Sequence, residues 1–254
     1  MYFMRRRKKD NVFVQGIRAG VLPVLISVYL MLSSTLIFAD TSLRSLFDFK
    51  EYPYKEIQIK GRGTLEPQYI KDSDYSTCWI FSIENIKGIE TFLYYPMGNN
   101  KECRKGKFEI NGQEFVYNES DFDLHSLKLC SANFEDKTFL MLLGNIGKYN
   151  DCICFIFDIT DSEHIVFYPP EKRFIEADFN KNFFGLYQNK LCFFFSTRRF
   201  EWNGRYKLSP YFIDGDLLKE LYDENGKPYF INYSYTTKYE QAFVIEEKNI
   251  PDGK

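Results

Sequence analysis

The stretch FEINGQEFVY, residues 108–117, decides the fold of this chain, because it predicts a β-hairpin from its own residues. Asn111-Gly112 stands between two short runs in which apolar and polar side chains alternate. An Asn-Gly pair suits a two-residue turn that needs positive φ angles, and alternation on its flanks is typical of half-buried strands. The chain repeats the pair at Asn203-Gly204 and Asn225-Gly226. The sequence therefore predicts antiparallel strands joined by tight turns.

Strand signals continue on both sides of this hairpin. Further short apolar or alternating runs lie at 56–60, 77–83, 91–96, 138–144, 152–159, 164–169, 190–196, 206–213 and 241–247. Aromatic residues make up 19% of the chain, and they favour strands and argue against disorder. We therefore expect an all-β, antiparallel multi-strand domain.

Two segments have a helical pattern instead. One is SLRSLFDF, residues 42–49, and the other is GDLLKELYDE, residues 215–224, in which Asp216 can cap a short helix. Both are too short to carry the fold, so the all-β prediction stands with two short helices added.

Three segments of the chain resemble one another. Residues 78–96 and 154–170 share an aromatic-rich strand, a polar turn and a second strand ending in Tyr and Pro, and residues 211–226 have a looser version. A strand, an Asp-containing turn and another strand are typical of a propeller blade. Their unequal spacing argues against a regular repeat. We therefore expect a small or degenerate β-propeller, slightly favoured over a β-sandwich.

The run VLPVLISVYLMLSSTLIFA, residues 21–39, contains no charge and follows five basic residues at 5–9. This layout is typical of a secretory signal peptide, here cleaved after Ala39. At roughly 19 residues the run nearly spans a bilayer, so an uncleaved signal anchor is the alternative. We expect residues 40–254 to form a single exported domain, periplasmic or extracellular, or else held outside the inner membrane by a single-pass anchor.

The charge balance excludes one class of partner. Six of the 33 basic residues and one of the 35 acidic residues lie in 1–39, so the exported part holds 27 basic and 34 acidic residues, a net charge of −7. Phosphate contacts need a basic face, so nucleic acid is not an expected partner. Membrane contact is expected only through residues 21–39, if they are not cleaved.

All six cysteines lie beyond the leader: Cys78, Cys103, Cys130, Cys152, Cys154 and Cys192. An even number in an oxidising compartment predicts at least one disulfide, although the pairing stays open. Cys152 and Cys154 alternate on a predicted strand and so share a face. Cys154 and Cys192 stand in apolar runs, which also suits buried free thiols. With two His and no paired CxxC motif, neither zinc nor another cofactor is expected.

Asp121, Asp123 and His125 form the sharpest constellation of polar side chains. On a strand these alternate positions share a face, so they are candidates for a metal or a polar substrate. The simpler interpretation, which we prefer, is an exposed polar face whose apolar alternates, Phe122 and Leu124, point into the core.

Asp158, Asp161, Glu163 and His164 crowd a short stretch between two predicted strands. The acids are candidates for calcium binding and His164 for acid–base chemistry. Asp, Thr and Ser are also ordinary turn formers, and we expect a turn. Asp72 and Asp74 are interpreted as part of a solvated loop.

The sequence assigns no catalytic residue. It has no GxSxG elbow that would present a serine, and a pair of carboxylates for glycoside hydrolysis leaves no characteristic spacing. The sequence therefore favours a binding role over an enzymatic one.

Tyrosine and tryptophan side chains next to turns or at strand ends are the candidate binding residues. Exposed there, they would supply rigid amphipathic area for a protein or sugar ligand. This set comprises Tyr94, Tyr95, Trp202, Tyr206, Tyr211, Tyr233 and Tyr235. The alternative is that these rings belong to a large β core.

Together these features favour an exported binding protein whose ligand is another protein, for example an inhibitor or immunity-type protein that covers its partner's active site. Two alternatives remain at this point. One is an extracytoplasmic glycan hydrolase with paired carboxylates, and the other is a structural envelope module held by an uncleaved anchor.

Overall fold

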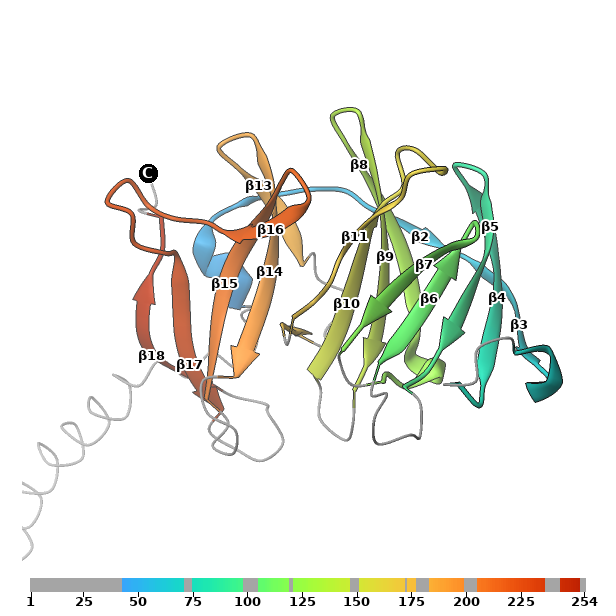
Figure 1. Ribbon diagram of the computed structural model, residues 1–254. Helices are drawn as coiled ribbons and strands as arrows, with labels where there is room; N and C mark the ends of the chain where they lie inside the picture. Colours follow the sequence, from blue (N-terminus) through green and yellow to red (C-terminus); the bar gives the residue numbers. More distant parts are fainter. Residues whose placement is uncertain are drawn as a thin grey trace, which may run out of the picture.

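The computed structural model consists of antiparallel β-sheets, which confirms the all-β prediction (Figure 1). It describes residues 43–70, 75–97, 105–118, 121–146, 151–171, 173–176, 183–198, 205–235 and 243–251. The predicted leader, residues 1–39, lies outside the described residues, as does the Asn203-Gly204 turn.

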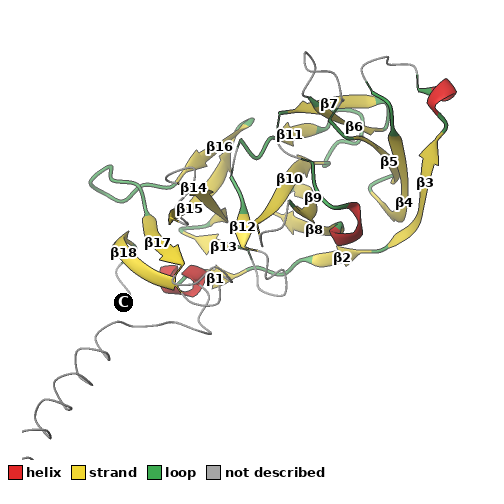
Figure 2. Cartoon of the chain, turned by 90° about the horizontal axis from the view of Figure 1, so that it is seen from below, coloured by secondary structure: helices red, strands yellow, loops and turns green. Residues whose placement is uncertain are grey.

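The five-stranded sheet is a meander of strands that follow one another along the chain and curl into a half-barrel (Figure 2). Its strands, in spatial order, are β3 (Ile59–Leu65), β4 (Cys78–Ile86), β5 (Ile89–Tyr95), β6 (Gly106–Ile110) and β7 (Gln113–Tyr117). It includes the hairpin predicted at 108–117, whose turn residues Asn111 and Gly112 have φ angles of 49° and 75°. Both angles are positive, as a type I′ turn requires.

The six-stranded sheet occupies the middle of the molecule (Figure 1). Its path runs through β11 (Val166–Tyr168), β10 (Asp151–Asp158), β9 (Lys137–Asn145), β8 (Lys128–Phe134) and β2 (Lys55–Ile57), and β12 (Ile175–Glu176) also pairs with β10. β9 and β10 are almost continuously apolar because both faces of this sheet are buried.

The seven-stranded sheet lies beyond it. Its path runs through β1 (Lys50–Glu51), β13 (Phe184–Tyr187), β14 (Lys190–Arg198), β15 (Arg205–Asp214), β17 (Phe230–Tyr235) and β18 (Phe243–Asn249), and β16 (Leu217–Glu220) also pairs with β15. Three short 3-10 helices complete the described elements: η1 (Leu43–Phe47), η2 (Pro67–Tyr69) and η3 (Leu124–Ser126).

One segment, residues 50–65, supplies an edge strand to each of the three sheets in turn (Figure 2). β1 pairs with β13, β2 pairs with β8, and β3 pairs with β4, all antiparallel. We call this segment the strap. Because it is continuous, it links sheets whose other strands come from distant parts of the chain.

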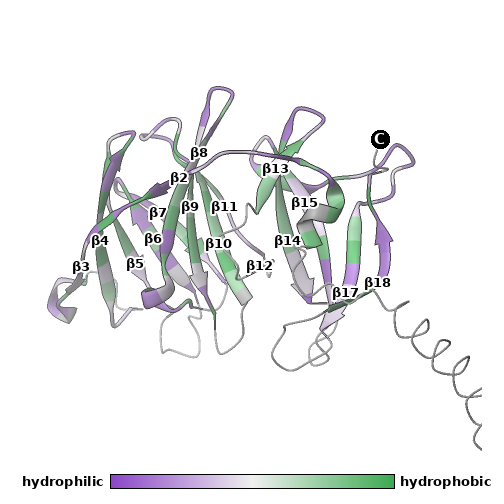
Figure 3. Cartoon of the chain, turned by 180° about the vertical axis from the view of Figure 1, so that it is seen from behind, coloured by the Kyte–Doolittle hydropathy of each residue, from purple (hydrophilic) through white to green (hydrophobic). Residues whose placement is uncertain are grey.

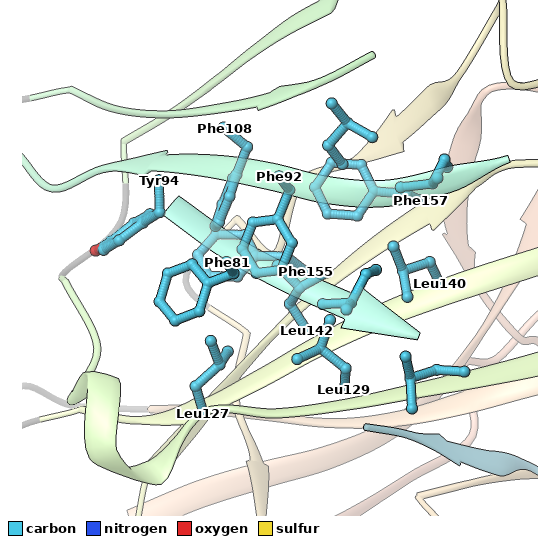
Figure 4. Packing of buried hydrophobic residues seen from close by; sticks show 14 of the residues in the cluster. Phe81, Phe92, Tyr94, Phe108, Leu127, Leu129, Leu140, Leu142, Phe155 and Phe157 are labelled. Carbon is cyan, nitrogen blue, oxygen red and sulfur yellow. The ribbon is translucent and has the colours of Figure 1, made fainter. Parts of the chain in front are cut away.

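The five- and six-stranded sheets pack face to face around the first core (Figure 4). Phe108 of the five-stranded sheet meets Phe155 of the six-stranded sheet edge-on, with ring centroids 4.8 Å apart. Gln113 joins the free edges of these sheets: its amide donates to the carbonyl of Ser162 and accepts from the N–H of Ile165. These contacts close the two sheets around their aromatic core.

The other face of the six-stranded sheet packs on the seven-stranded sheet around the second core, where Phe139 lies edge-on to Phe193. A third core lies on the far face of the seven-stranded sheet, where Phe47 of η1 packs against Phe194. Hydrophobic residues accordingly colour β10 and β14, whereas the edge strand β18 is largely hydrophilic (Figure 3). The molecule is therefore a stack of three sheets with η1 on its outer side.

The structure corrects one of the two helix predictions. Residues 42–49 do contain a helical element, the 3-10 helix η1, but residues 215–224 contain the strand β16. Gly215, with a φ of 62°, takes the first central position of a two-residue turn between Asp214 and Leu217, which starts a hairpin instead of a helix. Within the described ranges no helix is long and apolar enough to cross a bilayer.

The three segments that resemble one another all form antiparallel strand pairs. Residues 78–96 contain β4 and β5, residues 154–170 include most of β10 and all of β11, and residues 211–226 contain the end of β15 with β16. The sequence likeness therefore reflects a shared strand–turn–strand unit in each of the three sheets.

Candidate functional site

A cavity of about 720 Å³ opens at the end of the seven-stranded sheet, near the β13–β14 turn and the end of β18. We call it the outer pocket. Its polar lining comes from three carboxylates and three amides: Asp48, Asp223, Glu224, Gln188, Asn225 and Asn249. Its apolar wall is made by Phe47, Tyr187, Tyr229, Ile250 and Pro251.

Left-handed backbone conformations place two of the polar residues at the pocket. Asp48 directly follows η1 with a φ of 53°, and Gln188 opens the two-residue β13–β14 turn with a φ of 48°. Asn189, the second residue of that turn, has a φ of 61°, so the turn is of type I′. Such conformations are uncommon for residues other than glycine, and here they bring distant chain segments to one rim.

Asp223 organises the turn that forms one wall of the outer pocket. Its Oδ1 atom accepts from the N–H groups of Asn225 and Lys227, and its Oδ2 atom accepts from the side-chain amide of Asn249. The N–H of Lys227 is the main cause that lowers the pKa of Asp223. This carboxylate is therefore ionised and engaged in holding the turn, as an Asx turn requires.

Two tyrosines form the inner wall of the outer pocket. The hydroxyls of Tyr187 and Tyr229 lie 3.0 Å apart and share a hydrogen bond, and their rings meet edge-on. Phe49 stacks on Tyr187 with ring centroids 4.5 Å apart. Burial, together with the hydrogen bond to the Tyr187 hydroxyl, raises the pKa of Tyr229. The Tyr229 hydroxyl is therefore neutral, and its bond to Tyr187 holds it in place.

Asp48 and Glu224 differ from Asp223, because both are exposed at the rim. None of the described residues that line the outer pocket carries a positive charge. The pocket therefore combines aromatic surface, neutral hydroxyls and acceptor groups with a local excess of negative charge.

The predicted site at Asp121, Asp123 and His125 is a loop followed by η3 and not a strand. Asp121 accepts hydrogen bonds from the hydroxyls of Tyr94 and Tyr117, at 2.9 and 3.2 Å. Asp123 caps η3 by accepting from the N–H of His125, whose side chain is exposed. The two carboxylates thus have local structural roles.

The apolar alternates of this stretch behave as the preferred interpretation expects. Phe122 is buried and Leu124 packs against the first core. In the part of the chain that the structure describes, no group of three His, Cys, Asp or Glu side chains is placed to hold a metal ion.

The acidic stretch before β11 forms the predicted turn. Asp158, at the end of β10, accepts from the Lys137 ammonium at 2.9 Å and from Thr160. Asp161 accepts from the N–H of Glu163 and bonds the His164 ring at 3.0 Å, on the exposed surface. Asp72 and Asp74 lie outside the described residues.

The structure corrects the expectation that the candidate binding tyrosines are exposed. Four are buried in the cores, and two are half-buried: Tyr94, Tyr95, Tyr206 and Tyr233 belong to the first group, Tyr211 and Tyr235 to the second. The reason is that other layers cover the strand ends, as when Phe122 stacks on Tyr94 at 4.7 Å. Trp202 lies outside the described residues.

The predicted disulfide is not seen among the five described cysteines, all of which are buried: Cys78, Cys130, Cys152, Cys154 and Cys192. Cys152 and Cys154 do share a face, as predicted, and both lie in the second core with Cys130. Burial raises the pKa of the Cys154 thiol well above its ordinary value, so it packs as an apolar group. Cys103 lies outside the described residues.

The residues of the outer pocket carry no local sequence signal, apart from the turn at Asn225-Gly226. Asp48, Tyr187, Glu224 and Tyr229 come from three separate segments, and only the third core brings them together. Comparison with known protein families, with curated proteins and with solved structures gave no match.

Proposed function

We propose that this chain is an exported binding protein, that its ligand is another protein, and that the outer pocket is its binding site. The acidic excess of residues 40–254 supports a ligand that is attracted to negative charge. The basic head and apolar run of the leader support export.

The outer pocket is the observation that carries this proposal. Its volume of about 720 Å³ lies within the range of established ligand pockets, roughly 300–1,000 Å³. Aromatic side chains such as Tyr187 and Tyr229 are the type that dominates the energetics of protein interfaces. The pocket opens between turns, where inserting a partner's loop would leave the strand ladders intact.

An inhibitor or immunity-type protein is the concrete form that we propose, with the rim of the outer pocket covering a functional surface of the partner. The scaffold would be a degenerate β-propeller: the sheets stack face to face like neighbouring blades, and the strap begins each of them. Such a stack is a rigid support for a site built from turns.

Site-specific photo-crosslinking in the native cell tests the proposal. A photoreactive phenylalanine analogue at Asn225, on the rim of the outer pocket, is expected to crosslink to one defined protein. The matched control carries the analogue at Glu163, which is also exposed and lies in a different turn. Equal crosslinking at the two positions, or none at Asn225, would contradict a protein partner at this pocket.

Export is tested separately by sequencing the N-terminus of the exported product. A start at Asp40 is the expected result of cleavage after Ala39, and an intact chain in the membrane fraction would indicate the anchor. A full-length product found only in the cytosol would contradict export.

A further inference from the structure

The chemistry of the outer pocket narrows the class of ligand further. Resting on the proposed function, we infer that the outer pocket accepts a positively charged side chain of the partner protein, arginine in preference to lysine, together with its flanking peptide. The inference depends on the two exposed carboxylates, on the aromatic wall and on the hydroxyl pair.

Asp48 and Glu224 supply the attraction. They come from chain segments far apart in the sequence, line the same cavity, and are exposed. Lys227, the basic residue nearest to Glu224 in this turn, has its ammonium 5.5 Å from the centre of the Phe230 ring and does not line the pocket. A ligand cation is therefore the group that would balance this negative charge.

Asp223 is not counted among the groups that meet the ligand. Its oxygens already accept from two backbone N–H groups and from the Asn249 amide. Its role is to fix the turn that presents Glu224, so its own substitution would alter the shape of the pocket.

The aromatic wall favours a guanidinium. Phe49 stacks on Tyr187 and Tyr229 meets the same ring edge-on, so the ring of Tyr187 is held in place. A planar guanidinium can stack on such a ring while it donates to a carboxylate in two places. An ammonium can make the ionic contact but does not stack.

The hydroxyl pair is an independent feature that points to a peptide. Tyr187 and Tyr229 share one hydrogen bond, and the Gln188 amide donates to the Tyr187 oxygen at 3.5 Å. Two hydroxyls carry two protons, and this bond uses one of them. When Tyr229 donates in this bond, the second proton belongs to Tyr187, which is half-buried and lines the outer pocket, so a ligand in the pocket can accept it. A backbone carbonyl of the ligand would accept it.

Two other classes of ligand do not fit the outer pocket. A phosphate or other anion would be repelled by Asp48 and Glu224, and a metal ion finds no group of three ligands among the described residues. A neutral glycan could still bond the carboxylates, so it is included as an arm of the test.

The test is an NMR titration of the full exported chain with three probes. These are the acetylated and amidated tripeptide Gly-Arg-Gly, the same peptide with neutral citrulline in place of arginine, and chitotriose. We expect shifts at Tyr187, Gln188 and Tyr229 with the arginine peptide, and binding on the order of tenfold weaker with the citrulline peptide.

Substitution of both exposed acids, Asp48→Asn with Glu224→Gln, is expected to lower the affinity for the arginine peptide by about tenfold as well. Asn tolerates the left-handed backbone at position 48, so the fold is retained. The matched control, Asp136→Asn with Glu163→Gln, removes the same charge from exposed turns elsewhere and should leave binding within about twofold.

Equal affinity for the arginine and citrulline peptides, or a preference for chitotriose, would overturn the inference. So would a pocket variant that binds as the control does. These results differ from failure of the proposed function. Crosslinking at Asn225 that survives Asp48→Asn with Glu224→Gln would keep the protein partner and reject the basic side chain. Binding of the arginine peptide without any crosslink at Asn225 would keep the preference for a basic side chain and reject the protein partner.

Discussion

Gly106 leaves the space that the ring of Tyr117 occupies. The two residues face each other across the β6–β7 ladder, and a Cβ atom at Gly106 would stand 2.0 Å from the Cζ atom of Tyr117. The buried ring is thereby positioned so that its hydroxyl donates to Asp121. The absence of one side chain thus allows the junction that fastens the loop at 121–123 to the five-stranded sheet.

Gly106→Ala is expected to destabilise the protein by roughly 1–3 kcal/mol, because the added methyl group must displace the Tyr117 ring or the strand. Urea unfolding followed by tyrosine fluorescence measures the loss. Gly63→Ala is the matched control, since a Cβ at this strand position meets nothing within 4 Å. If both variants have the same midpoint, the close approach of Gly106 and Tyr117 does not matter to stability.

Asp121→Ala is expected to lower the free energy of unfolding by about 1–3 kcal/mol. The reason is that the buried hydroxyls of Tyr94 and Tyr117 lose their common acceptor. A double-mutant cycle with Tyr117→Phe checks the cause. The second substitution should cost less in the Asp121→Ala background than in the wild type. Strictly additive free energies of unfolding would mean that the two groups are not coupled.

Ile57→Ala is expected to lower the free energy of unfolding by roughly 2–4 kcal/mol. Ile57 is the buried residue of β2 and attaches the strap to the first core, whereas its neighbour Glu56 is exposed. Glu56→Ala therefore serves as the control and should change the free energy of unfolding little. Hydrogen exchange of the strap amides adds a local measurement, and unchanged protection in Ile57→Ala would contradict the anchoring role.

The ion pair between Lys137 and Asp158 predicts that the free energy of unfolding depends on pH in the acid range. Burial alone would raise the pKa of Asp158, but bonds from Thr160 and Lys137 outweigh it and lower the pKa below its ordinary value. The unfolded chain therefore takes up the proton first, and the stabilisation present at neutral pH is lost as the pH falls through the folded pKa. Asp158→Asn should remove this component, so its difference from the wild type should shrink between about pH 6 and pH 3. A constant difference over that range would contradict it.

The burial of the described cysteines predicts how they react with an alkylating reagent. Under native conditions, alkylation should spare the five described cysteines, because they are buried and burial raises the pKa of thiols such as Cys154. In denaturant without reductant, all five should react in the variant Cys103→Ser. Mass spectrometry counts the adducts, and a pair of cysteines that resists alkylation until reductant is added would show a disulfide.

Much of the strand pattern could be predicted from neighbouring residues. Asn111-Gly112 favours positive φ angles whatever lies around it, and the alternation beside it continues as β6 and β7. The pattern at 215–224 misled because Leu217, Leu218 and Leu221 have helical spacing. The pairing of β16 with β15 depends on the turn at Gly215 and on a partner strand, which helical spacing does not reveal.

The candidate site could not be predicted in the same way. Tyr94 lies near the end of β5 and Tyr233 lies within β17, and both rings are buried instead of exposed. Tyr187 and Tyr229 line a pocket only because η1, the β13–β14 turn and the turn at 223–226 meet beside them. Which layer covers a strand end depends on contacts between residues far apart in the chain.

The sequence by itself determined that this protein is built from antiparallel strands and tight turns, and it determined the acidic excess beyond residue 39. Side-chain alternation and turn preferences act between neighbours, so they can be predicted locally. Only the tertiary structure decided the order of the three sheets, the burial of the described cysteines and the place of the outer pocket. These follow from which apolar faces meet, because the burial of apolar area is non-directional and does not name its partner in advance.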